Sequence, residues 1–267
     1  MTSFCNIVID ACPRPQLART LLFARELSDA FGSRVTGISC VWPRRSATAV
    51  ALASALSSQT EVHSMEHALR ASRIIFDEVF AGGNAGSEWF SGISDPVTAM
   101  RRHLLTADLL ITDVPGEGAY LQPDPAALAI ECGTAVLRLG KKLPARFSKV
   151  VVAWKDSPQA RRAMHEALPI LKVAERVTVI GVGDEVTEER LAAVVVHLGC
   201  HNVKAHYRHV PKEHDGVCST LQQAARHEGA SLIVSGLYGR SSMAERILGG
   251  VSKEMMAGIE ISWLMAH

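Results

Sequence analysis

The sequence predicts an α/β protein with two tandem, doubly wound parallel-sheet domains of Rossmann-like type. Three observations predict it: the chain contains an internal repeat, each repeat alternates strand patterns with helix patterns, and the strand patterns are apolar almost throughout. Near-continuous apolar strands separated by helices form a parallel sheet that helices cover on both faces.

The repeat consists of two copies of one unit. Phe4–Asp10 aligns without a gap with Phe147–Ala153, and Ala107–Thr112 aligns with Ala230–Ser235 at a smaller offset. The first copy therefore carries about 20 extra residues in its middle. The basic, proline-interrupted linker 140–146 separates the copies, so we expect domains at residues 1–145 and 146–267.

Each copy is expected to alternate strands and helices. The expected strands are Asn6–Asp10, Arg34–Val41, Asp108–Thr112, Ala135–Leu139, Lys149–Trp154, Arg176–Val182, Val203–Val210, Ser231–Ser235 and Ile261–Met265. The expected helices are Pro15–Phe31, His63–Ala81, Val97–Leu105, Pro125–Cys132, Pro158–Val173, Thr187–Leu198 and Gly216–Glu228. Two further stretches are ambiguous or irregular: Arg44–Thr60 reads as a helix or a surface loop, and Ala81–Trp89 as a turn or flexible loop.

The stretch after Ser231–Ser235 is the main functional signal. Four glycines lie between this strand and a helix that is expected to begin near Val251, with Arg240 among them. Exposed backbone N–H groups at such a loop, together with the positive end of a helix dipole, bind phosphate. The alternative is that these glycines only end helices and turn the chain. The pattern is neither the Walker motif nor the dinucleotide GxGxxG motif.

The spacing of these glycines, Gly236-x2-Gly239-x9-Gly249-Gly250, resembles the G-x2-G-x9-G-[S/T] nucleotide signature of the universal stress protein family. The closing residues Leu264–His267 resemble the last strand of its proteobacterial tandem members. The resemblance is close in the second half and loose in the first. It implies strand order 3-2-1-4-5 and an adenine nucleotide, ATP with Mg²⁺, in the second domain. The residues that it implies at the site are Val182, Gly236, Gly239, Gly249, Gly250 and Val251. Arg240 either contacts phosphate or forms an ion pair on the surface, and its neighbours favour phosphate.

Two positions depart from the family pattern. Gly250 stands where the family has a Ser or Thr whose hydroxyl reaches the terminal phosphate or its metal. Lys155 stands where ATP-binding members have an Asp that contacts the nucleoside, and Asp156 follows one residue later. Lys155 either reaches a phosphate as a point charge or is an exposed lysine at a strand end. A shift of one residue in the alignment would give Asp156 the family role.

The first half lacks the phosphate signature. Pro123 and Pro125 delay the helix after its fourth strand, so we expect no phosphate cradle there, and this half is expected to serve as a partner surface. A zinc site built from His201, His206, His209 and His214 with Cys200 is disfavoured, because His206 and His209 would point to opposite faces of a strand. We therefore expect no metal site, and His165 is expected on a helix surface.

Composition limits the class of partner and the compartment. Lys plus Arg total 28 against 27 Asp plus Glu, so no basic field attracts nucleic acid or an anionic membrane. No apolar run reaches the roughly 18 residues that a membrane span needs. The six cysteines form no CxxC pair, and no leader resembles a signal peptide, which favours a cytoplasmic protein.

The function we expect is that of a cytoplasmic stress-response protein that binds ATP in its second domain, with at most slow hydrolysis. The resemblance implies an internal pseudo-dimer through Ala135–Leu139 and Ile261–Met265, and a homodimer is a further alternative. The competing hypothesis is a nucleotide-free dimerisation or interaction module that has lost the site. A third is an enzyme that acts on an adenylated or phosphorylated metabolite through Lys155.

Overall fold

The computed structural model describes residues 3–43, 59–82, 86–114, 120–213, 216–237 and 260–267. The chain divides into two compact units, Phe4–Leu128 and Ala129–His267 with Met1–Ser3. Most of the ambiguous stretch Arg44–Thr60 lies outside the described residues, as does the helix expected near Val251. No described helix is long and apolar enough to cross a membrane.

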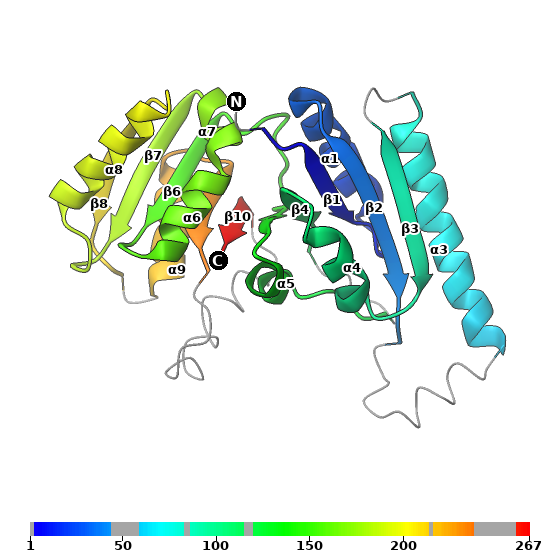
Figure 1. Cartoon of the computed structure of the whole chain (residues 1–267). Coiled ribbons are helices and arrows are strands. Elements are labelled where there is room, and N and C mark those ends of the chain that lie inside the picture. The colour runs from blue at the N-terminus through cyan, green and yellow to red at the C-terminus, as the bar shows by residue number, and fades with distance from the viewer. Residues whose placement is uncertain (1–2, 44–58, 83–85, 115–119, 214–215, 238–259) are drawn as a thin grey trace. The chain divides into compact units, whose positions relative to one another are not determined.

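The first unit is built on a parallel sheet of β1 (Asn6–Asp10), β2 (Arg34–Val41), β3 (Ser87–Ile93) and β4 (Leu109–Thr112). With β5 (Ala135–Arg138), the strands of the first half follow the order β3-β2-β1-β4-β5. This is the expected 3-2-1-4-5 order. Figure 1 labels the first four of them. The buried residues of β1 and β4 explain why their apolar runs were readable from the sequence.

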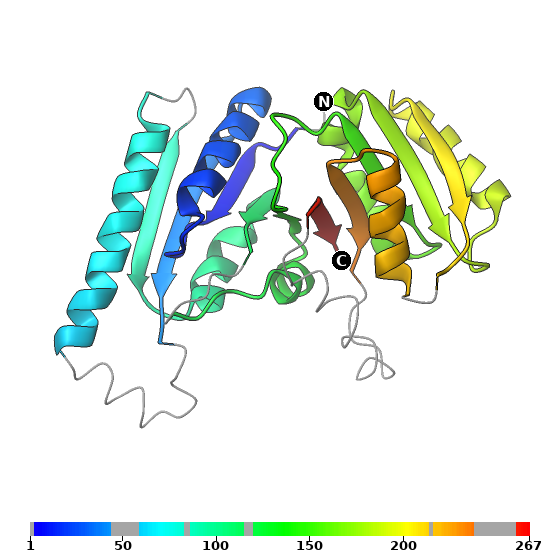
Figure 2. The ribbon, with the colours of Figure 1, turned by 180° about the vertical axis from the view of Figure 1, so that it is seen from behind.

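The helices described in the first half are α1 (Leu17–Phe31), α3 (Gln59–Phe80), α4 (Pro96–Leu104) and α5 (Pro125–Cys132). Helix α1 ends at Gly32, whose φ of 67° is the left-handed conformation that glycine adopts at little cost. Helices α1 and α3 cover one face of the strands and α4 the other, as Figures 1 and 2 show.

Strand β3 corrects the last part of the turn or loop expected over Ala81–Trp89, because Ser87–Trp89 belong to the strand, whereas residues 81–82 form a turn. The strand pattern is hidden because β3 is an edge strand whose residues are half-buried or exposed, so it has no apolar run. Its anchor is Trp89, whose ring packs against Phe76 of α3 with centroids 4.9 Å apart. Both rings lie over Gly37 of β2, where an added Cβ would be 2.7 Å from Phe76 and 2.8 Å from Trp89.

The second unit contains five parallel strands in the order β8-β7-β6-β9-β10, again 3-2-1-4-5. They are β6 (Lys149–Trp154), β7 (Arg176–Val182), β8 (Ala205–Val210), β9 (Leu232–Gly236) and β10 (Ser262–Ala266). Strand β5, which ends the first repeat, also lies in this compact unit and pairs antiparallel with β10. The compact unit therefore begins at Ala129, before β5. The domain boundary expected from the repeat lies after β5, at residue 145, and stays a prediction.

The helices of the second unit are α6 (Pro158–Glu166), α7 (Leu168–Val173), α8 (Glu188–Cys200) and α9 (Val217–His227). Helices α6 and α8 lie on one face of the sheet (Figure 1) and α9 on the other (Figure 2). The single helix expected over Pro158–Val173 is divided at Ala167, because Pro169 lacks the N–H that would continue the ladder.

Gly37 and Gly92 are both strand glycines, and they allow a matched test of the packing over β2. We expect Gly37→Ala to lower the free energy of unfolding by about 1–3 kcal/mol, because the ring of Phe76 is held by Phe80 and Trp89 and cannot move aside. Gly92→Ala has no atom within 4 Å of its new Cβ and should change stability by less than about 0.5 kcal/mol. Urea unfolding of both variants checks this, and equal effects would contradict it.

Candidate functional site

The carboxyl ends of β6, β7 and β9 lie at one edge of the second sheet. Strand β6 pairs in parallel with β7 on one side and with β9 on the other. Lys155 and Asp156 follow β6, Val182 ends β7, and Gly236 ends β9. Ligands of doubly wound sheets bind at this edge. The structure thus places four of the predicted site residues there, whereas Gly239, Arg240, Gly249, Gly250 and Val251 lie outside the described residues.

Lys155 is ion-paired at this edge. Its Nζ lies 2.5 Å from Oε2 of Glu185, and the two side chains are 51% and 69% exposed. The hydrogen bond and charge of Lys155 lower the pKa of Glu185. Ion pairs at this degree of exposure contribute little to stability, so a ligand could replace this one at small cost.

Asp156 is held by two donors. Arg190, in the first turn of α8, donates from Nε at 2.8 Å, and the indole Nε1 of Trp154 donates at 2.9 Å. These bonds, that of Arg190 first, lower the pKa of Asp156. Glu185 and Arg190 were missed from the sequence. A signal was available, because both residues follow β7 in the sequence, and the oppositely charged Lys155 and Asp156 follow the neighbouring strand β6.

Gly236 lies against the start of α6. A Cβ at Gly236 would be 2.5 Å from the backbone N of Ala160 and from the backbone carbon of Gln159. Ser157 caps this helix by accepting a hydrogen bond from Ala160 N at 3.2 Å, with Pro158 at the first helical position. Gly236 therefore allows the end of β9 to approach the helix N-terminus closely, and its contact with a ligand stays a prediction.

The end of β9 is also fixed by β10. The indole Nε1 of Trp263, which is fully buried, donates to Oγ of Ser235 at 2.7 Å. Leu237 N donates to Ala266 O at 2.8 Å. The hydroxyl of Ser235 thus has a structural partner. The chain leaves β9 from a rigidly held position.

The equivalent edge of the first sheet contains buried charges. Asp10 at the end of β1 forms an ion pair with Arg14, and each side chain is only 1% exposed. Asp10 also accepts from Thr112 Oγ1 at 2.9 Å. Burial raises the pKa of the neighbouring Cys12 thiol well above its usual value, so the thiol stays protonated.

A second buried carboxylate lies beside this pair. Arg19 donates from Nη2 to Asp113 at 2.6 Å and from Nε at 3.2 Å, and Thr20 Oγ1 donates at 2.9 Å. The chain's own cations therefore satisfy both Asp10 and Asp113. Among the described residues of this half, the carboxyl edge is filled by its own ion pairs rather than arranged around a phosphate.

His206 and His209 have different partners. His206 Nε2 lies 2.9 Å from Thr178 Oγ1, and His209 Nε2 lies 2.9 Å from the carbonyl of Gly183. His214 lies outside the described residues. His201 instead lies beside His165 and His197, a group that was missed because it joins two helices. Burial, and then the charge of Arg161, lowers the pKa of His165.

The buried pair of the first sheet gives a stability prediction. We expect Arg14→Met to lower the free energy of unfolding by about 3–5 kcal/mol, because Asp10 is left as a buried, unpaired charge. The same change in an Asp10→Asn background should cost clearly less. Arg146→Met, which breaks an exposed pair with Glu175, is the control and should cost less than about 0.5 kcal/mol. Unfolding in guanidinium measures the stability of the three single variants and of the double variant. If Arg14→Met costs as much in the Asp10→Asn background as in the unchanged protein, the charge argument is wrong.

The comparisons with known sequences give no match: no protein-family model matches the chain, and no curated protein is significantly similar to it. Solved structures do match.

A universal stress protein from Archaeoglobus fulgidus DSM 4304 superposes with a TM-score of 0.78 at 12% identity, covering 99% of this chain and 96% of the other. A putative universal stress protein from Pseudomonas aeruginosa UCBPP-PA14 gives 0.61 at 15% identity, covering 98% and 93%. A protein of unknown function from Pseudomonas aeruginosa PAO1 gives 0.59 at 15% identity, covering 98% and 92%. Over nearly its whole length, the chain therefore has the two-domain α/β fold of solved universal stress proteins.

Proposed function

We propose that the second half binds an adenine nucleotide, ATP, at the carboxyl edge of its sheet, and that the protein serves a stress response. The observation that carries the proposal is the meeting of three features at one edge. Gly236, the first glycine of the spaced segment 236–251, ends β9; Lys155 follows the adjacent strand β6; and α6 begins beside Gly236. Glycine loops and helix N-termini are the elements that bind phosphate.

The residues at this edge and those of the glycine-spaced segment would hold a nucleotide in the following way. Lys155 would leave its ion pair with Glu185 and contact the phosphates with its ammonium group. The residues that would surround the phosphates are Gly239, Arg240, Gly249, Gly250 and Val251. The backbone near Val182 would contact the base. Asp156 would contact the nucleoside only after release from Arg190.

Magnesium would arrive with the phosphates of ATP. The carboxylates of Asp156 and Glu185 are already paired with Arg190 and Lys155, so neither is arranged as a general base. We therefore expect hydrolysis to be slow at most.

The proposal includes a compartment and an association. All six cysteines are described and none is in a disulfide, which fits a reducing cytoplasm. The antiparallel pairing of β5 with β10 supports an internal pseudo-dimer in which the two repeats associate through their last strands.

The alternative is a nucleotide-free interaction module. Two observations favour it: Lys155 and Asp156 already have partners within the chain, and Gly250 lacks the hydroxyl of the family pattern. Denaturing the purified protein and identifying any released small molecule separates the two. Bound ATP or ADP supports the proposal, and a protein that stays empty after incubation with ATP and Mg²⁺ supports the module.

Lys155 provides the quantitative test. We expect Lys155→Ala to weaken ATP binding about tenfold, because a phosphate contact is lost, and to leave adenosine binding unchanged. Lys204→Ala is the matched control: it removes the same charge just before β8, at the opposite end of the sheet, and should change neither affinity. Calorimetric titration measures both ligands.

Gly249→Asp tests the phosphate loop itself. A carboxylate there should repel the phosphates and abolish ATP binding while adenosine binding is retained. ATP affinity unchanged by Gly249→Asp would refute the phosphate-loop assignment, whatever the outcome at Lys155.

A further inference from the structure

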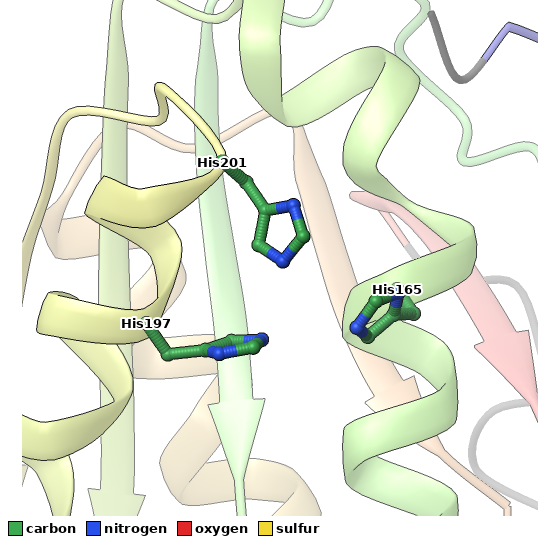
Figure 3. A group of neighbouring side chains, drawn as sticks. All are labelled: His165, His197 and His201. Atoms are coloured by element: carbon green, nitrogen blue, oxygen red, sulfur yellow. The ribbon is translucent and has the colours of Figure 1, made fainter.

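Three histidines on two neighbouring helices converge on one space in the second unit (Figure 3). His197 lies in the last turn of α8 and His201 immediately follows that helix, so the two are one turn apart on the same face. His165 lies in the last turn of α6, which covers the same face of the sheet. All three side chains are half-buried.

The distances between the rings suit a shared ligand. One nitrogen atom from each ring can be chosen so that all three lie within 4.8 Å of one another. The ring centroids are 4.9, 5.2 and 5.8 Å apart. A tetrahedral zinc ion with Zn–N bonds of about 2.0–2.1 Å holds its nitrogens about 3.4 Å apart. Small side-chain rotations of half-exposed rings would close this difference.

The setting also favours a cation. Within the described part of the chain, none of these three rings has a hydrogen-bond partner, whereas His206 and His209 each have one. Both helices end near the group, and helix C-termini carry partial negative charge. The nearby side-chain charges do not add to this, because Glu166 next to His165 is already bonded to Arg162 at 2.8 Å and the charge of Arg161 acts on His165. The ion would be held by the three rings and the helix ends.

We propose that His165, His197 and His201 bind one divalent transition-metal ion of the class that prefers imidazole, such as Zn²⁺. Three protein ligands leave a fourth position for water or a small ligand, as in open rather than closed zinc sites. Because α8 runs from the carboxyl edge back towards the start of β8, the ion would lie away from the proposed nucleotide edge. It would also tie the end of α8 to α6.

The test is a Zn²⁺ titration of tag-free, metal-free protein in competition with a chromophoric chelator. We expect one tightly bound ion per chain. Single His165→Ala, His197→Ala and His201→Ala variants should each weaken binding about tenfold or more, because each removes one of three ligands.

A matched control exists in the first unit. His63 and His67 of α3 are also one turn apart and exposed, but no third histidine joins them among the residues that the structure describes. The double variant His63→Ala/His67→Ala should leave the tight site unchanged. If that variant loses it, or if His165→Ala binds as tightly as the unchanged protein, the three-histidine site is wrong.

Thermal unfolding provides a second readout. Zn²⁺ that binds only the folded state should raise the unfolding temperature of the unchanged protein and of the α3 control, but not that of His165→Ala. Circular dichroism without metal confirms that each variant is folded. A folded protein that binds no Zn²⁺ at millimolar concentration would overturn the proposal.

Discussion

The parallel pairing of β6 between β7 and β9 is the constraint on which the rest of the second unit depends. It orders the apolar residues of the central strands against helices on both faces, and it fixes the direction of every strand. Because the strands are parallel, the segments after β6, β7 and β9 all emerge at one edge. Residues as distant in the chain as Lys155, Glu185 and Gly236 are thereby placed together, and the return of α8 places His201 at the other end.

The fold could be predicted because its buried strands appear in the sequence as runs of mainly apolar residues. Strands β1, β2, β6 and β7 begin and end at the expected residues, since both their faces are covered and most of their positions are buried. Strand β3 was missed because an edge strand needs no such run: Trp89 anchors it through a contact with Phe76 that only the tertiary structure creates. The division of α6 from α7 had a local signal, Pro169, that was readable.

The strand ends that form the candidate site were predictable from the sequence, but the pairings of the charged residues that follow them were not. The glycine spacing and the strand ends indicate the carboxyl edge. The partners of Lys155 and Asp156 depend on how the segment after β7 lies beside the segment after β6, which no local pattern specifies. The histidine group shows the same limit. The spacing of His197 and His201 is a readable helical pair, whereas His165 joins them only because α6 and α8 pack side by side.

The carboxyl edges of the two sheets differ in how deeply their ion pairs are buried. This difference favours the second edge as the place where a ligand would bind. In the first half, Asp10 and Arg14 are almost wholly buried, so separating them would leave each charge buried without its partner. In the second half, Lys155 and Glu185 are largely exposed and water can replace either partner cheaply. A phosphate could therefore take the place of Glu185 beside Lys155 while the fold stays intact. A phosphate bound at the edge of the first sheet would have to break the buried Asp10–Arg14 pair.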